Sequence, residues 1–322
     1  MKKKVLVVIP VEKHHQKLLE EAYPDGEFYY QMRDEVTDLE DVHVIIGNVI
    51  PRSLKNAKNL EWIQLNSAGA DQYIKEGILK KETILTNATG AYGLALSEQL
   101  LAGTLALMKR INQYQRNQVK HLWKDEGIVH SIYGARTLII GLGDIGSSYG
   151  QKMKALGSTV VGIKRHVQSR PVWLDELYSM DSLDQELAKA DIVAMSLPST
   201  PLTTHLIDKR RLSLMRRHAI LLNVGRGDAI VTEDLCYALN KGLIFGAFLD
   251  VTDPEPLPKE NALWDADNIL ITPHIAGDFH LQETLEKVID ITCKNLKRFQ
   301  TGAPLENIVD RSTGYALHNK RV

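Results

Sequence analysis

The chain has 322 residues, of which 44% are hydrophobic and 25% are charged, as expected for a globular protein that buries a substantial core. Lys and Arg number 39 against 40 Asp and Glu, so the formal net charge is −1 and excludes a strong global field for recruiting nucleic acid or an anionic membrane. The length favours two domains, and no fixed-period repeat, low-complexity tract or long linker interrupts the chain.

The first part of the chain predicts a small α/β domain. The opening Met1-Lys2-Lys3-Lys4 and the apolar run 5–9 imitate a secretory signal, but Pro10 ends that run too soon, so we expect a first strand. Further strand-like runs alternate with helical or loop stretches, at residues 42–46, 62–65 and 83–86. This part would form the substrate domain.

Membrane insertion and disulfide chemistry find no support in the sequence. No apolar stretch approaches the roughly 18 residues of a membrane span. The two cysteines, Cys236 and Cys293, are interpreted as reduced thiols. We therefore expect a cytoplasmic protein, and we assign no metal site.

Two helices are predicted to join the domains. Apolar residues keep helical spacing across residues 97–110 (Leu94, Leu101, Leu105 and Met108), and again near the C-terminus (Leu285, Val288, Ile289, Leu296 and Phe299). The first helix would enter a dinucleotide-binding domain at 100–288. The second would return the chain, so that residues 1–99 and 289–322 form one discontinuous domain, with a cleft between the domains and a hinge near both helices.

A glycine-rich hexad, Gly141-Leu142-Gly143-Asp144-Ile145-Gly146, directly follows the apolar run 138–140. That run predicts a buried parallel strand, and residues 147–156 predict a helix that begins after the third glycine. Gly141 would permit a tight turn, Gly143 would let a pyrophosphate approach the backbone, and Gly146 would let helix and strand pack closely. Amide groups at the helix N-terminus would then face the phosphates. The alternative is a glycine-rich loop that only turns a corner.

Basic residues follow the next strand, at residues 160–163, where an NAD-specific fold places an acidic residue for the ribose hydroxyls. Here the chain has Lys164, Arg165 and His166. A Lys-Arg pair attracts the additional phosphate of NADP, whereas a carboxylate repels it. The sequence thus predicts a preference for NADPH, the alternative being solvated basic residues at a strand end.

The predicted strand at 221–224 ends at Gly225-Arg226-Gly227, on the strand edge where open α/β sheets form their ligand crevice. A guanidinium there can bind a small substrate's carboxylate through two hydrogen bonds and polarise a neighbouring carbonyl oxygen. Taken alone, Arg226 could equally be a surface arginine at a turn.

Two further strands, at 246–251 and 269–272, precede Glu255 and His274. Glu255 stands between Pro254 and Pro256, which restrict its backbone, and His274 follows Pro273. A His that delivers a proton near neutral pH needs a carboxylate to orient its ring and favour the protonated form. Either residue alone could be structural. Because both follow strands of the same predicted sheet as Arg226, we expect all three to converge on one crevice.

The order of these segments resembles the D-isomer-specific 2-hydroxyacid dehydrogenase family nearly from end to end. The resemblance includes Asn66-Ser67-Ala68-Gly69-Ala70-Asp71 as a substrate loop, Ala88-Thr89-Gly90-Ala91-Tyr92-Gly93, and Asn307-Ile308-Val309-Asp310. It implies an α/β fold of two doubly wound domains: a Rossmann nucleotide-binding domain and a discontinuous, flavodoxin-like substrate domain.

The resemblance also implies the roles of the site residues. Arg226 would bind the carboxylate and keto oxygen, His274 would exchange a proton with the C2 oxygen, and Glu255 would support the imidazolium. The amides of Ala68 and Gly69 would hold the carboxylate. The remaining cofactor-binding positions would be Leu197, Pro198, Thr203, Val224 and Asp250, the last contacting the nicotinamide carboxamide.

Formate dehydrogenases of the family have Gln at the position of Glu255. We therefore do not expect formate dehydrogenase activity. The chain ends soon after Asp310, where the phosphoglycerate branch often carries a regulatory domain. The basic pair resembles NADP-using, glyoxylate/hydroxypyruvate reductase-like members, although NAD stays open as the cofactor. The particular 2-keto acid also stays open, with Tyr92 either lining its pocket or packing in the core. A homodimer is expected by analogy.

These observations predict transfer of a hydride from NADPH to a small 2-keto acid, with His274 as acid and Arg226 as electrostatic stabiliser, giving a D-2-hydroxy acid. The alternative is a nicotinamide-sensing, corepressor-like interaction protein with little turnover, because the family includes such proteins. The absence of a long disordered extension for partner recruitment disfavours it.

Overall fold

The computed structural model describes residues 2–165, 167, 169–314 and 316–317, and the chain divides into two compact units. One unit comprises residues 1–92 and 281–322, and the other comprises residues 93–280. The divisions lie several residues before the expected boundaries at 99 and 288. At the first division, α2 (Gly93–Met108) packs against α4 (Asp144–Ala155) from its first turn, and so belongs entirely to the second unit. At the second, α8 (Gln282–Thr301) belongs entirely to the first unit.

The first unit is built on a five-stranded parallel sheet in the order β2-β1-β3-β4-β5. This is the flavodoxin-like strand order expected from the resemblance. Its strands are β1 (Lys3–Val7), β2 (Gly26–Tyr30), β3 (Val44–Ile46), β4 (Trp62–Gln64) and β5 (Ile84–Thr86). The helices α1 (Lys13–Ala22) and α8 (Gln282–Thr301) pack together, and 3₁₀ turns lie at η1 (Arg33–Glu35) and η2 (Pro51–Asn56).

Both faces of this sheet are covered by apolar residues. On one face, Leu6, Ile45, Ile63 and Leu85 pack against side chains of the connecting segments. On the other, Trp62 is fully buried beside Phe299 of α8, and its Nε1 donates a hydrogen bond to Thr86 Oγ1 at 2.8 Å. The returning helix α8 therefore belongs to the first unit's core, although it lies about 200 residues from β5 in sequence.

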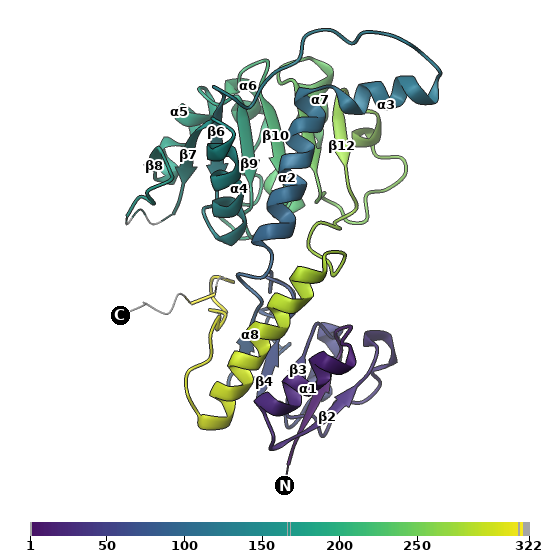
Figure 1. Ribbon diagram of the computed structural model, residues 1–322, viewed down its shortest axis with the longest axis vertical. Coiled ribbons are helices and arrows are strands. Elements are labelled where there is room, and N and C mark those ends of the chain that lie inside the picture. Colours follow the sequence, from purple (N-terminus) through teal and green to yellow (C-terminus); the bar gives the residue numbers. More distant parts are fainter. Residues whose placement is uncertain (1, 166, 168, 315, 318–322) are drawn as a thin grey trace. The chain divides into compact units, whose positions relative to one another are not determined.

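The second unit contains a seven-stranded parallel sheet in the order β12-β11-β10-β9-β6-β7-β8 (Figure 1). The strands are β6 (Arg136–Ile140), β7 (Thr159–Ile163), β8 (Glu176–Tyr178), β9 (Ile192–Met195), β10 (Ile220–Asn223), β11 (Gly246–Leu249) and β12 (Ile269–Ile271). The strand order reverses between β6 and β9, and such a switch point forms the ligand crevice of doubly wound sheets. The predicted α/β fold with a Rossmann-type domain is confirmed.

Helices cover both faces of this second sheet. On one face α2 packs on α4, β10 and β11. The opposite face carries the larger apolar cluster, to which strands contribute together with α5 (Leu183–Leu187), α6 (Lys209–Leu214) and α7 (Thr232–Asn240). Shorter 3₁₀ turns are η3 (Met180–Ser182), η4 (Gly227–Ala229) and η5 (Ala262–Asp265). Because both faces are covered, the strands are continuous apolar runs in the sequence.

Helix α3 (Ile111–Val119) lies at the β12 side of the second unit, and the long segment that follows it runs back across this unit to β6 (Figure 1). The helix is held there by Asn112, whose Nδ2 donates to Asn268 Oδ1 at 2.8 Å. Across residues 111–133, which we call the arm, large apolar side chains are exposed, above all Trp123 at 106% and Tyr133 at 81%. In the described part of the chain, no helix is both long and apolar enough to cross a membrane.

Candidate active site

The glycine hexad lies between β6 and α4, as predicted, but the helix begins at Asp144 rather than at Ser147. Gly141 has φ +101°, and a Cβ there would lie 3.0 Å from the Ser196 backbone oxygen, so the turn requires glycine. Gly146 lies inside the first helical turn, where a Cβ would lie 2.0 Å from Gly141 O. This close approach of helix to strand explains why helical geometry extends back into the hexad.

Gly143 is the N-cap of α4, and no atom lies within 4 Å of the position that its Cβ would occupy. No side chain caps this helix end, and the first amides of a helix have no intrahelical acceptor. The half-buried Ile145 is in this first turn. The open glycine face and the helix N-terminus fit a pyrophosphate.

The Asp144 carboxylate has a partner of its own in the second unit. Its Oδ2 accepts a hydrogen bond from the Gly93 amide at 2.7 Å, and a Cβ on Gly93 would collide with the carboxylate. The side chain thereby binds the first residue of α2. The negative charge of Asp144 thus lies at the N-terminus of α2, where the helix dipole stabilises it.

Lys164 and Arg165 directly follow β7, and both side chains are exposed. The Lys164 amide donates to Tyr178 O at 3.1 Å, so β8 holds the backbone at this position. The two residues thus lie at the carboxyl edge of the strand adjacent to β6. His166 lies outside the described residues.

The segment 196–204, which follows β9, contains three of the predicted cofactor-binding residues, Leu197, Pro198 and Thr203. Ser196 Oγ donates to Gly141 O at 3.0 Å, so the segment lies beside the glycine turn. Thr203 is buried, and its hydroxyl donates to Pro198 O at 2.7 Å. Val224 is buried and directly follows the neighbouring strand β10. Its amide donates a hydrogen bond to Met195 O.

Arg226 follows β10 at the same edge of the sheet and is half-buried. Asn223 Nδ2 donates to its carbonyl oxygen at 2.8 Å, and its own Nη1 donates to Gly225 O at 2.8 Å. A Cβ on Gly227 would collide with the backbone of Thr252. The arginine turn therefore packs directly on the loop that carries Glu255.

Glu255 and His274 form a hydrogen-bonded pair, with His274 Nδ1 at 2.9 Å from Glu255 Oε2. The other carboxylate oxygen of Glu255 accepts the Thr252 amide at 2.9 Å, which orients the carboxylate. Glu255 lies between two prolines, and both X-Pro bonds, Asp253-Pro254 and Glu255-Pro256, are cis.

The pair shifts the pKa of each partner. The hydrogen bond that His274 donates to Glu255 raises the pKa of His274 above its ordinary 6.5, against opposing contributions from burial and from the positive charge of Arg226. Burial raises the pKa of Glu255, but the hydrogen bonds from His274 and Thr252 outweigh it, and the net pKa is lowered. The positive charge of Arg226 lowers the pKa of both residues. The structure thus pairs His274 with Glu255, while the joint role of these two residues with Arg226 stays a prediction.

Asp250, at the end of β11, holds the turn that carries His274. The carboxylate is buried; its Oδ1 accepts from Thr272 Oγ1 at 2.6 Å and the Ile275 amide at 3.1 Å, and its Oδ2 accepts the Ala276 amide at 3.1 Å. Its backbone oxygen accepts the His274 amide at 2.8 Å. This positioning role was missed, because the sequence carries no signal that pairs residues on adjacent strands.

In the first unit, the loop with Ala68 and Gly69 follows β4 and is held through its carbonyl groups. Asn87 Nδ2 donates to Ala68 O at 2.6 Å, and Ser67 Oγ donates to Gly69 O at 2.6 Å. Tyr92 is 5% exposed, and its hydroxyl donates to Asn66 O. Tyr92 therefore packs in this unit's core and supports the loop, while its contact with substrate stays a prediction.

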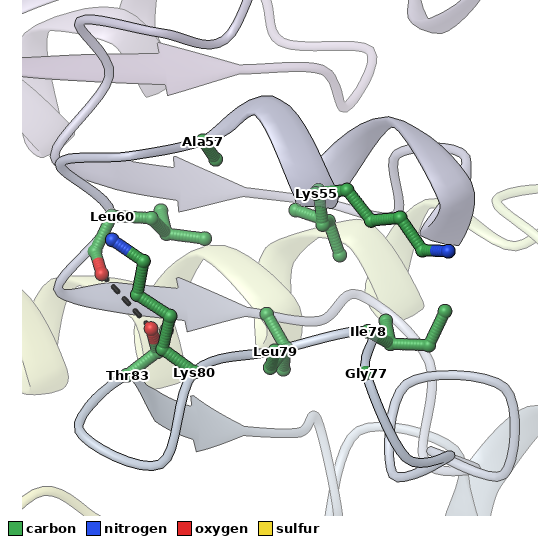
Figure 2. Close-up of a pocket in the computed structure, with 9 residues that line it drawn as sticks. Lys55, Ala57, Leu60, Gly77, Ile78, Leu79, Lys80 and Thr83 are labelled. Carbon is green, nitrogen blue, oxygen red and sulfur yellow. Dashed lines mark hydrogen bonds between the residues drawn. The ribbon is translucent and has the colours of Figure 1, made fainter.

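A pocket of about 300 Å³ lies elsewhere in the first unit, and Figure 2 shows its apolar wall of Leu60, Ile78 and Leu79 with Lys55 and Lys80 at its rim. Thr83 closes one side by donating its Oγ1 to Leu60 O at 2.9 Å. None of the predicted site residues lines this pocket. The titratable side chains that line it are those of Lys55 and Lys80.

One group of metal-ligand side chains, His14, His15 and Glu286, occurs among the described residues where α1 meets α8. The Glu12 amide donates to His15 Nδ1 at 3.1 Å, so the neutral ring carries its proton on Nε2, which lies 3.1 Å from Glu286 Oε1. A metal at Nε2 would require the other tautomer. The group is thus explained as a helix N-terminal hydrogen-bond network.

Comparison with known proteins identifies the family. The sequence model of the D-isomer specific 2-hydroxyacid dehydrogenase NAD-binding domain matches residues 101–276, more than half of the chain. The chain belongs to this family. A 2-hydroxyacid dehydrogenase of this kind is an NAD(P)-dependent oxidoreductase, which agrees with the glycine cradle and with the pairing of His274 and Glu255.

Three relatives illustrate the range within this 2-hydroxyacid dehydrogenase family. A family member from Aeromonas salmonicida has a structure with a TM-score of 0.84 at 30% identity, covering 97% of this chain and 100% of its own. An NADPH-dependent glyoxylate/hydroxypyruvate reductase from Sinorhizobium meliloti, crystallised with NADP and sulfate, has a TM-score of 0.82 at 25% identity. The match covers 98% of this chain and 100% of the reductase. The glyoxylate reductase of Thermococcus litoralis is 28% identical in sequence, and the match covers 97% of this chain and 98% of the reductase.

Proposed function

We propose that this dehydrogenase reduces a small 2-keto acid, of the glyoxylate or hydroxypyruvate type, to a D-2-hydroxy acid with NADPH. The observation that carries the proposal is the hydrogen bond between His274 and Glu255 in the same unit as Arg226. Relatives named glyoxylate reductase and hydroxypyruvate reductase support the substrate class.

The bound nicotinamide would supply the hydride to C2 of the substrate. Arg226 would bind the carboxylate and stabilise the negative charge that develops on the keto oxygen. Because His274 Nδ1 is bonded to Glu255, the imidazolium would donate its proton from Nε2 to that oxygen. Glu255 would hold the ring and keep it protonated, and Asp250 would hold the backbone of the turn.

The preference for NADPH rests on Lys164 and Arg165. Both are exposed directly after β7, and two basic side chains favour the additional phosphate of NADP through charge-assisted hydrogen bonds. The relative from Sinorhizobium meliloti is NADPH-dependent, which supports the same cofactor preference. The predicted roles of the Ala68 and Gly69 amides in carboxylate binding also belong to this proposal.

The arm, residues 111–133, supports a homodimer. Its exposed apolar side chains include Val119 at 73% and Tyr133 at 81%, besides Trp123 and Ile128. Contiguous apolar surface on a globular protein marks an interaction site, and these side chains follow one another along a single segment. We assign a second copy of the chain as its occupant, and a cytoplasmic location stays a prediction.

Absorbance of NADPH, and separately NADH, tests the function as the purified protein meets glyoxylate, hydroxypyruvate, pyruvate, 2-ketoisocaproate and phosphohydroxypyruvate. We expect rapid oxidation of NADPH with glyoxylate or hydroxypyruvate, and chiral analysis of the product should give the D-isomer. If NADPH binds tightly but no acid is reduced, the proposal fails and the nicotinamide-sensing alternative gains support.

A further inference from the structure

Asp228 connects two segments of the nucleotide-binding unit that are far apart in sequence. It lies in η4, two residues after Arg226, and its Oδ2 accepts hydrogen bonds from Ser199 Oγ at 2.5 Å and Thr204 Oγ1 at 3.3 Å. Both hydroxyls belong to segment 196–204. A single carboxylate oxygen thus ties this segment to the arginine turn.

The backbone continues the same connection. The His205 amide donates to Asp228 O at 2.7 Å, and the Ile207 amide donates to Ala229 O at 2.9 Å. Ile207 and Ile230 then form a parallel bridge. These bonds fix the chain after residue 204, and the side chain of Asp228 adds a connection to the earlier part of the segment, at Ser199.

The other end of segment 196–204 contacts the glycine turn and the start of the arginine turn. Ser196 Oγ donates to Gly141 O, and a Cβ on Gly225 would lie 2.5 Å from Leu197 O. The segment is therefore fixed between the cradle for the pyrophosphate and the residue before Arg226. A displacement of Ser199 would be transmitted to Pro198 and Leu197.

The second oxygen of this carboxylate is in an unusual environment. Oδ1 of Asp228 is buried and has no hydrogen-bond partner among the described residues. A buried carboxylate oxygen without a donor opposes folding, so stability alone does not account for an Asp at this position. Such groups concentrate at functional sites.

We propose that Asp228 is a positioning residue for the cofactor, whose carboxylate holds segment 196–204 in the conformation that binds the nicotinamide dinucleotide. The proposal rests on the proposed function, because Leu197, Pro198 and Thr203 are cofactor-binding residues only within it. In this role Asp228 acts through Ser199 and Thr204.

The test compares four variants with the wild type: Asp228→Ala, Asp228→Asn, Ser199→Ala, and Ser199→Ala combined with Asp228→Ala. NADPH binding is measured by fluorescence titration, turnover by absorbance, and folding by thermal unfolding. Asp234→Ala is the matched control, because the Asp234 carboxylate also accepts a hydrogen bond, from the Lys209 amide at 2.8 Å, but outside segment 196–204.

We expect Asp228→Ala to raise the Kd and KM for NADPH about tenfold, the usual effect of losing a hydrogen bond to a charged group, with kcat at saturating NADPH within about twofold. Ser199→Ala should weaken binding in the same direction, and the double variant should lose less than the product of both effects. Asp228→Asn retains an acceptor oxygen and should restore most of the binding.

Unchanged NADPH affinity in both Asp228→Ala and Ser199→Ala would overturn the proposal while leaving the proposed function intact. An equal loss of affinity in Asp234→Ala would also overturn it, because the effect would then be a general loss of stability. If Asp228→Ala does not fold, Ser199→Ala decides between these outcomes. A wild-type protein that binds neither NADPH nor NADH would refute the proposed function itself.

Discussion

His274 Nδ1 lies 2.9 Å from Glu255 Oε2, which leaves Nε2 as the ring nitrogen that can deliver a proton to a substrate. The two residues come from different loops, after β12 and after β11, and these strands are neighbours in the sheet. The pair is thus a product of the fold. In the proposed function, His274 is the acid and Glu255 is the carboxylate that orients it.

Replacing His274 by Ala removes this acid. We expect kcat for keto-acid reduction to fall by about 10²- to 10⁴-fold, the usual contribution of a positioned proton donor. The Kd for NADPH, measured by fluorescence, should change little, because the glycine cradle is formed by other residues. A mild loss of kcat would argue against the assignment.

Glu255→Gln should change the pH dependence of reduction. Glu255 raises the pKa of His274 above 6.5, and reduction requires the protonated ring, so activity falls as the pH rises through that pKa. Without the carboxylate the pKa falls, and the alkaline limb of kcat/KM against pH should shift to lower pH. A limb at the same pH in both proteins would show that another group controls it.

Arg226→Lys keeps the positive charge but loses the planar guanidinium. An ammonium group cannot form the same two-point contact with a carboxylate, so we expect kcat/KM for the keto acid to fall about 10- to 100-fold. Steady-state kinetics with the best substrate check this. Arg217→Ala, which removes an exposed arginine from another part of the same unit, serves as the control and should leave the kinetics unchanged.

Replacing Lys164 and Arg165 together by Ala should reduce the preference for NADPH. We expect the KM for NADPH to rise about tenfold or more, because two charge-assisted contacts are lost, while the KM for NADH changes little. Lys241→Ala is the control. This exposed residue follows the C-terminus of α7, whereas the crevice is formed at the other end of the sheet, by the carboxyl ends of the strands. Equal effects on both cofactors would contradict the assignment.

Trp123→Glu should weaken self-association through the arm. A charge in an apolar interface is unfavourable to bury, so we expect the dimer to dissociate at concentrations at which the wild type stays associated. Light scattering after size-exclusion chromatography reports the mass. Val172→Glu, at another fully exposed apolar residue, should leave the mass unchanged. A wild-type monomer would refute the proposed dimer.

The sequence predicted the strands that carry Arg226, Glu255 and His274 because each is a short apolar run with a clear break after it. It missed β9 (Ile192–Met195), although all four residues are buried, since no glycine motif or catalytic residue marks its end. That strand lies beside β6 at the switch point. Segment 196–204 could therefore be assigned to the cofactor only by resemblance.

Asp250 shows a second limit of the sequence. Its contact with the nicotinamide stays a prediction. The sequence did not show that its two carboxylate oxygens accept bonds from Thr272, Ile275 and Ala276, more than 20 residues away. Such contacts depend on the pairing of β11 with β12, which periodicity along one strand does not reveal. Asp228 was missed for the same reason.

The left-handed backbone of His274, with φ 53°, fixes the direction in which the ring leaves its turn. Few residue types other than glycine adopt this region readily, and His is among those enriched there. The bonds from the turn to Asp250 maintain that conformation. The site is therefore preorganised: little of the binding energy of a substrate needs to be diverted to ordering the proton donor, and more is left to stabilise the transition state.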